Sequence, residues 1–202
     1  LNPIIVDGRK GVLTLKSMKF TDEQIIEHLR KPDFLPNFTP DEVQKYFIDG
    51  DMPKVDYVNE ERRANYQLNI NGGTIKQGIP EKKFDTSNMF SSGAGAGFSV
   101  FVMSPGGTLF ANEHKPGLFH HSSFLEGLPT AGAGELEVKG GKLKRLTNKS
   151  GHYHPGARHT YQVLTQLQMQ GVKLSSFKLT IKSSLEEKGV DYNKEWKTAR
   201  AF

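Results

Sequence analysis

The sequence predicts an α+β fold: a twisted, mainly antiparallel sheet with two N-terminal capped helices and one C-terminal helix. Three observations lead to this prediction. Two capping-box patterns lie in the N-terminal quarter of the chain. Short apolar segments separated by glycine-rich turns fill the middle, and apolar residues at helical spacing follow near residue 160. With 202 residues, of which 36% are apolar, the chain can bury one sizeable core.

We expect the chain to have three parts. Residues 1–54 form an N-terminal strand and a helical pair packed on the main domain, residues 55–181 form a β-rich core domain that carries a polar site, and residues 182–202 form a charged C-terminal tail. The chain begins with Leu1, and it shows no signal peptide and no apolar run long enough to cross a bilayer. We therefore expect a soluble module excised from a longer protein, compatible with the cytosol or with delivery into a host cytosol.

Both N-terminal helices have well-marked starts. Thr21 stands three positions before Gln24, and Thr39 stands three positions before Glu42. This is the spacing of a capping box, in which each side chain bonds to the other residue's backbone N–H. The two patterns predict helices that begin at these threonines, the second of them ending near Gly50.

The predicted sheet begins with a hairpin. Tyr66, Leu68 and Ile70 alternate with polar residues and lead into Asn71-Gly72, a dipeptide that favours a type I′ turn. Phe98–Met103 is apolar at both odd and even positions, which is typical of a central strand buried on both faces.

A second hairpin and a helix complete the fold. Gly140-Gly141 separates Glu135–Val138 from Lys142–Lys144 and predicts a tight turn between two strands. A helix is expected from about residue 157 to 170, and its inner face is predicted from the helical spacing of three apolar residues, Tyr161, Leu164 and Leu167.

The glycine-rich run at residues 91–97 admits two interpretations. A phosphate-binding loop would need a strand before it, a helix after it and a following Lys-Ser or Lys-Thr, and the sequence has neither that context nor that dipeptide. A mobile loop, or a place where the backbone crosses close to another segment, fits the run better.

Polar residues gather between residues 118 and 155, where four of the seven histidines lie. If residues 119–124 form a strand, His120 and His121 point to opposite faces, and Ser123 shares the face of His121. We therefore predict one polar site made by two segments. Its candidate catalytic residues are His121, Ser123, Glu135, His152 and Tyr153, and its candidate cofactor-binding residues are Ser122 and Gly151.

Several functions fit this set of side chains. The residues could satisfy one another and stiffen a turn, or hold a ligand or protein partner in a polar pocket. A group-transfer enzyme such as a mono-ADP-ribosyltransferase is an alternative, with NAD as its cofactor and Glu stabilising a cationic sugar centre. A further alternative is a metal site whose ligands are His121, His152 and His154. A Ser-His-Asp hydrolase is not expected, because the Gly-x-Ser-x-Gly elbow is missing.

Charge and cysteine content exclude other classes. The chain has no cysteine, so disulfides, thiol nucleophiles and Cys-ligated zinc are excluded. Its net charge is +5, with a local basic cluster at Lys139, Lys142, Lys144, Arg145 and Lys149. This cluster is either a solvated hairpin edge or a dock for phosphate or an acidic partner. Nucleic acid is not expected, because no aromatic-basic binding motif accompanies the cluster.

The ordered motifs from residue 55 to 181 resemble the C-terminal region of the plant IQ-motif calmodulin-binding protein family. The resemblance implies a shared fold, and related stretches in microbial toxin or effector proteins imply a module of that kind. The IQ helix that binds calmodulin lies outside the matched region, so calmodulin is not an expected partner, and Glu135 stands where the plant proteins tend to carry Arg. The residues that carry the resemblance are Asn59–Tyr66, Phe98–Met103, His121–Leu125, Gly132–Gly134, Ser150–Tyr153 with Pro155, and Gly171–Leu174.

Overall fold

The computed structural model of the chain describes residues 21–24, 39–51, 54–151, 153–181 and 197–198. These residues belong to two compact units. The first unit comprises Leu1–Asp56 together with Lys115–His120, and the second comprises Tyr57–His114 together with His121–Phe202.

The first unit confirms both capping boxes. The Thr21 N–H donates to Gln24 Oε1 at 2.9 Å, and the Gln24 N–H donates to Thr21 Oγ1 at 3.3 Å. Thr39 and Glu42 make the same pair of bonds at 3.0 and 3.1 Å. Here they start helix α3 (Pro40–Glu42), which continues as a π-helical stretch, η1 (Val43–Ile48). The predicted N-terminal strand and the course of the first helix beyond residue 24 lie outside the described residues.

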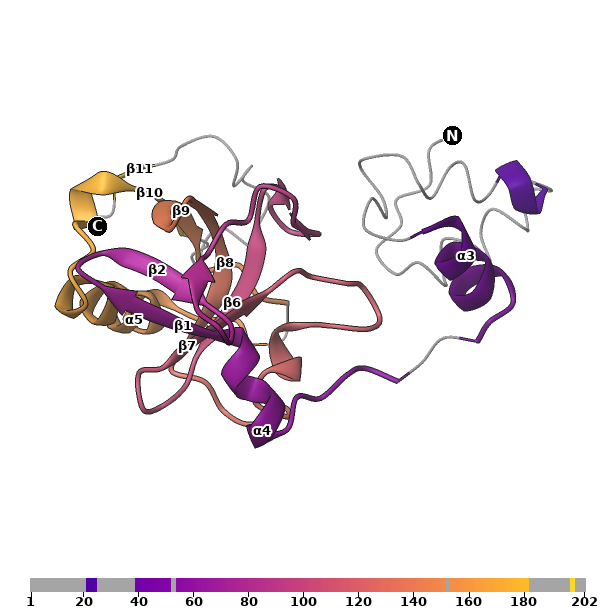
Figure 1. Cartoon of the computed structure of the whole chain (residues 1–202), viewed down its shortest axis with the longest axis horizontal. Helices are drawn as coiled ribbons and strands as arrows, with labels where there is room; N and C mark the ends of the chain where they lie inside the picture. The colour runs from indigo at the N-terminus through magenta and orange to yellow at the C-terminus, as the bar shows by residue number, and fades with distance from the viewer. Residues whose placement is uncertain (1–20, 25–38, 52–53, 152, 182–196, 199–202) are drawn as a thin grey trace. The chain divides into compact units, whose positions relative to one another are not determined.

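The second unit is built on a mainly antiparallel sheet (Figure 1). Within the described residues it has nine strands in the order β11-β10-β9-β8-β6-β7-β1-β2-β3. Among the strands that the structure describes, only β9 and β10 pair in parallel. The strands are β1 (Gln67–Asn71), β2 (Thr74–Gln77), β3 (Lys82–Lys83), β6 (Ser99–Met103), β7 (Leu109–Asn112), β8 (Gly132–Lys139), β9 (Lys142–Thr147), β10 (Lys178–Thr180) and β11 (Lys197–Thr198). A separate two-stranded sheet joins β4 (Phe90–Ser91) to β5 (Gly95–Ala96).

The predicted α+β fold is therefore confirmed, and so is the central position of the Phe98–Met103 strand. All five residues of β6 are buried, and β6 pairs with β7 on one side and β8 on the other. The first hairpin differs from its prediction by one position. Asn71 pairs with Thr74, so the two turn residues are Gly72 and Gly73, which adopt φ angles of +55° and +71°. Two glycines at the turn meet the type I′ requirement for positive φ.

Helix α4 (Glu60–Arg63) is short and is capped by the side chain of Asn59, which accepts a bond from the Arg62 N–H at 3.0 Å. A 3₁₀ turn, η2 (Ala64–Tyr66), then leads directly into β1. This lead-in matters for the site, because the Arg63 side chain reaches the segment that contains His121.

Helix α5 (Ala157–Met169) covers one face of the sheet, and a second 3₁₀ turn, η4 (Leu174–Ser176), follows it. Leu164 and Leu167 are buried as predicted, but the prediction for Tyr161 was wrong, because this side chain is 67% exposed. Val163 takes the inward position instead: a Cβ placed on Gly132 of β8 would lie 2.3 Å from its methyl group. Because α5 packs closely on β8 at Val163, the buried face of the helix is rotated away from Tyr161.

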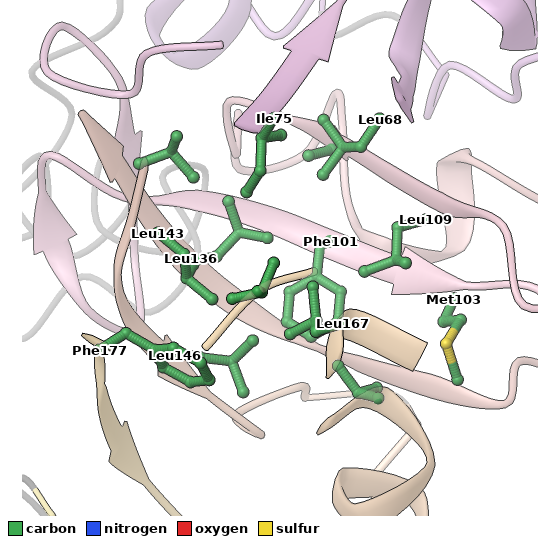
Figure 2. Packing of buried hydrophobic residues seen from close by; sticks show 14 of the residues in the cluster. Leu68, Ile75, Phe101, Met103, Leu109, Leu136, Leu143, Leu146, Leu167 and Phe177 are labelled. Atoms are coloured by element: carbon green, nitrogen blue, oxygen red, sulfur yellow. The ribbon is translucent and has the colours of Figure 1, made fainter. Parts of the chain in front are cut away.

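The hydrophobic core lies between α5 and this face of the sheet. Figure 2 shows side chains of neighbouring strands, among them Phe101, Leu136 and Leu146, converging with Leu167 of the helix. Burial of such side chains is the main favourable contribution to folding.

The sheet curls so that β2 approaches the β8–β9 hairpin. The Ile75 N–H of β2 donates to the Gly141 carbonyl at 2.8 Å, and the Gly141 N–H donates to the Phe84 carbonyl at 2.8 Å. The Thr86 N–H donates to the Val138 carbonyl of β8, also at 2.8 Å. The segment after β3 therefore bridges β2 and the β8–β9 hairpin, and it brings the glycine-rich run that follows it onto the outer face of β8.

Candidate functional site

Residues 119–124 do not form the predicted strand. His121–Ser123 is a 3₁₀ turn, η3, whose main chain is held from outside the sheet. The Val58 N–H donates to the Ser123 carbonyl at 2.9 Å, and the Arg63 guanidinium Nε donates to the Phe124 carbonyl at 2.8 Å. Because these carbonyls are satisfied by Val58 and Arg63, the segment has no need of a strand partner.

His121 and Ser123 are buried, as a site-facing pair would be, but through a turn rather than through strand alternation. The His121 Nε2 atom lies 2.8 Å from the carbonyl oxygen of Gly134. A carbonyl accepts only, so Nε2 carries the proton in this bond. His121 thus contacts the main chain of β8 at the residue directly before Glu135.

The Glu135 carboxylate is the centre of a buried polar network. Glu135 is only 2% exposed, and its side chain lies on the face of β8 opposite to Leu136. Its Oε1 atom accepts a short hydrogen bond from the Ser91 hydroxyl, and its Oε2 atom accepts one from the Thr147 hydroxyl at 3.1 Å. The Gly93 N–H bonds to the same carboxylate.

Burial raises the pKa of Glu135, because a low-dielectric surrounding disfavours the charged form. Hydrogen bonds from Ser91, Thr147 and Gly93 and the positive charge of Lys149 act in the opposite direction, but burial outweighs them. Within the described part of the chain, the network therefore keeps this carboxyl group in the interior without an ion pair in direct contact.

The glycine-rich run, residues 91–97, covers the Glu135 carboxylate. Gly93 has no room for a side chain, because a Cβ there would lie 2.4 Å from Glu135 Oε1. The run is tied down on its other side by two bonds: the Ser92 N–H donates to His114 Nδ1 at 3.2 Å, and the Phe90 N–H donates to Glu113 Oε1 at 3.1 Å. The predicted close approach of the backbone is confirmed at Gly93.

Ser91 and Thr147 are network residues that the sequence did not predict. Ser91 belongs to the glycine-rich run, where no local pattern marks it as a partner of Glu135. Thr147 lies opposite Glu135 because the β8–β9 hairpin contains a register shift between Glu137 and Val138. Counting residue pairs outward from the Gly140-Gly141 turn would have placed Leu146 opposite Glu135, so the hairpin pattern alone points to the wrong partner.

The second segment of the predicted site, residues 150–155, makes a different set of contacts. The Tyr153 hydroxyl donates to the Leu128 carbonyl at 2.9 Å, and the Tyr153 N–H donates to Ser150 Oγ at 3.4 Å. Burial, with the nearby Tyr57 phenol as a smaller cause, raises the pKa of Tyr153. His152 lies outside the described residues, so its placement beside His121 stays a prediction.

The remaining candidates are Ser122, Gly151 and His154. The Ser122 carbonyl accepts a bond from the Gly127 N–H at 2.9 Å. Gly151 is exposed, and a Cβ added there would have no neighbour within 4 Å. His154 adopts a φ of +44°, which is uncommon for a residue with a side chain. The structure thus brings His121 to Gly134, the residue of β8 directly before Glu135. The side chain of Tyr153 instead bonds to the loop at Leu128.

The segments that build this network, from Arg63 through β6 and β8 to the start of α5, lie in a region shared with known proteins. Residues 62–160 match the family model described as the IQ motif-containing protein middle domain. This region of the chain is an IQM middle domain. The resemblance predicted from the sequence is thereby confirmed, and every candidate residue of the site falls within the domain.

Three relatives from Arabidopsis thaliana illustrate the match to the IQM middle domain. The chain is 33% identical to IQ domain-containing protein IQM3 over 138 residues, which cover 68% of this chain and 29% of the relative. It is 30% identical to IQM2 over 126 residues (62% and 20%) and 38% identical to IQM1 over 80 residues (40% and 16%). The chain thus spans less than a third of the length of each relative. The proteins compared give no support to a toxin or effector, and no solved structure matches the chain.

The described part of the chain shows neither a cluster of metal-binding side chains nor a helix that could span a membrane. Among the described residues, no group of three or more His, Asp or Glu side chains is placed to hold a metal ion. Because the ligand set of His121, His152 and His154 includes a residue outside that part of the chain, it stays a prediction. No helix in the described ranges is long and apolar enough to span a bilayer.

Two cavities lie elsewhere in the second unit. One, of about 440 Å³, has a lining that includes Gln67 and Asn69 of β1, Gln166 of α5 and Gln170 directly after α5. The other, of about 420 Å³, lies beside the turn of the β1–β2 hairpin. Neither cavity is lined by a candidate residue of the predicted site.

Proposed function

We propose that the IQM middle domain of this chain is a ligand- or partner-binding domain in which the network around Glu135 is a structural support. The observation that carries the proposal is the state of the Glu135 carboxylate. It is 2% exposed and is bonded to Ser91, Thr147 and Gly93. A catalytic carboxylate must come within hydrogen-bond reach of its substrate, and this one is enclosed by the protein's own donors.

The network supports the surface by fixing the glycine-rich run. The Glu135 carboxylate bonds to Ser91 and Gly93 of the run. His114 and Glu113 accept bonds from two other N–H groups, those of Ser92 in the run and of Phe90 directly before it. A backbone held at several points loses little further entropy when a ligand or partner binds to the surface it forms. This is the advantage that a buried polar network offers to a binding domain.

The alternative of a mono-ADP-ribosyltransferase that uses NAD stays a prediction, and no contact of the described residues favours it. The same experiment tests both functions. The full chain and its Glu135→Gln and Glu135→Ala variants are incubated with labelled NAD and cell lysate, and their melting temperatures are measured in parallel. A binding domain transfers no label in any of the three, and only Glu135→Ala melts clearly earlier. Label transfer by the unsubstituted chain that vanishes in Glu135→Gln at an unchanged melting temperature would overturn the proposal.

A further inference from the structure

The cavity of about 420 Å³ in the second unit is formed where three segments of the chain meet. These are the Gly72-Gly73 turn of the β1–β2 hairpin, the start of β9, and the segment that follows α5. Its lining residues are Gly72, Gly73, Lys142, Leu143, Lys144, Gly171, Val172, Lys173 and Ser176. We call this cavity the lysine groove.

The lysine groove concentrates positive charge. Lys142, Lys144 and Lys173 line it and are exposed, and no Asp or Glu is among its lining residues. The ion pairs found among the described residues involve none of these three lysines. Lys142 Nζ instead donates to a neutral group, the Thr74 hydroxyl, at 2.9 Å. The groove therefore keeps roughly three positive charges that no carboxylate of its own neutralises.

The basic cluster predicted from the sequence divides at this point. Lys139 and Arg145 bind the Glu137 carboxylate at 3.2 and 2.5 Å on the outer face of β8. Lys142 and Lys144 are left to the groove, where Lys173 joins them from a distant part of the sequence. The fold thus separates cations that are internally paired from cations that are available.

The wall of the groove is built by direct contact between two turns. A Cβ on Gly73 would lie 2.5 Å from the Gly171 carbonyl oxygen, and one on Gly171 would lie 3.0 Å from the Gly72 Cα. The Gly73 N–H also donates to the Gln170 carbonyl at 3.1 Å. Only glycine permits this approach, since Gly73 and Gly171 both have positive φ. The floor is apolar, because Leu143 and Val172 line the groove and belong to the hydrophobic core.

We propose that the lysine groove binds a small organic molecule that carries two phosphate groups. Lysine is a common point-charge ligand of phosphate. One phosphate ester carries about −1.5 to −2 charges at neutral pH, so two such groups match three ammonium groups better than one does. The volume falls in the range of small-molecule sites, about 300–1,000 Å³, and the apolar floor can receive the organic part of the ligand. This inference does not depend on Glu135, so it and the proposed function can fail separately.

The test uses calorimetric titration of the full chain with inorganic pyrophosphate at low salt, about 50 mM, where exposed charges are least screened. The double variant Lys144→Ala/Lys173→Ala is expected to weaken binding about tenfold, equivalent to about 1.4 kcal/mol. Lys142 is kept, because its bond to Thr74 also holds the hairpin. Lys82→Ala/Lys83→Ala is the matched control, since both lysines are exposed, their replacement removes the same two charges, and neither lines the groove. It should change the dissociation constant less than twofold.

Two further ligands distinguish the groove from a general attraction to anions. Poly-glutamate and a single-stranded oligonucleotide are titrated under the same conditions. Pyrophosphate binding that is lost in the double variant and kept in the control supports the proposal, provided that the melting temperatures agree. The proposal is overturned if the unsubstituted chain does not bind pyrophosphate, if both variants bind it equally, or if only the two polymers bind.

Discussion

The Nε2 atom of His121 lies 2.8 Å from the carbonyl oxygen of Gly134, so a turn outside the sheet is bonded to the strand beside its buried carboxylate. This bond gives the first prediction. His121→Ala removes a buried donor and should lower the free energy of unfolding by about 1–3 kcal/mol. His121→Gln, whose amide can take the place of Nε2, should recover part of the loss. Urea unfolding of the three chains measures both effects, and equal stability of all three would show that the bond contributes nothing.

The contact between Gly93 and Glu135 predicts a steric effect. Gly93→Ala places a methyl group 2.4 Å from Oε1 of Glu135, so either the carboxylate leaves its hydrogen bonds or the glycine-rich run shifts, at a cost of about 1–3 kcal/mol. Gly151→Ala is the control, because its new methyl group meets open space and should change stability by less than about 0.5 kcal/mol. Thermal unfolding compares them. If the two variants melt together, the enclosure of Glu135 by the glycine-rich run is wrong.

The buried carboxyl of Glu135 predicts a dependence of stability on pH. Its pKa is raised in the folded chain above the ordinary value of 4.5, so the folded state holds the proton more tightly than the unfolded state. The contribution of Glu135 to stability is therefore full below pH 4.5 and is lost as the pH rises through the folded pKa. Glu135→Gln removes this titration.

Chemical unfolding of both chains at a series of pH values checks this expectation. The stability of Glu135→Gln relative to the unsubstituted chain should rise with pH above 4.5 and then level off. A constant difference across the series would mean that Glu135 has an ordinary pKa in the folded chain.

Asp85 shows the opposite behaviour on the surface. Hydrogen bonds from Ser87 and from the Gly140 N–H lower its pKa to about 2, the latter with a length of 2.7 Å. Because the folded pKa is depressed, the stabilisation is present above the unfolded pKa of 3.8 and is lost as the pH falls toward 2. A carboxyl carbon titration by NMR should give a midpoint near 2, and Asp85→Asn should remove the corresponding acid-induced loss. A midpoint near 3.8 would contradict the bond to the β8–β9 turn.

Local patterns in the sequence predicted most of the fold. Capping at Thr39, the turn at Gly140-Gly141 and the all-buried strand β6 each depend on neighbours within a few residues, and each is confirmed. The inner face of α5 was only partly predicted. Tyr161 fits the helical spacing, but close packing of Val163 on Gly132 sets the rotation of the helix.

The candidate site depended on long-range contacts that local patterns do not reveal. His121 lies on a 3₁₀ turn because Val58 and Arg63 bind the carbonyls of that segment from a distant part of the chain. Thr147 faces Glu135 because of a single register shift in a hairpin. The sequence predicted Glu135 and His121 as candidate site residues, but their hydrogen-bond partners follow from the three-dimensional arrangement.

The close fit of Gly93 over Glu135 has a consequence for evolution of the family. The two positions share one small space, so their side-chain sizes cannot vary independently. In IQM middle domains where position 93 carries a larger residue, position 135 should carry a shorter side chain or one that turns away. Substitution histories at these two positions should therefore be linked, although they stand far apart along the chain.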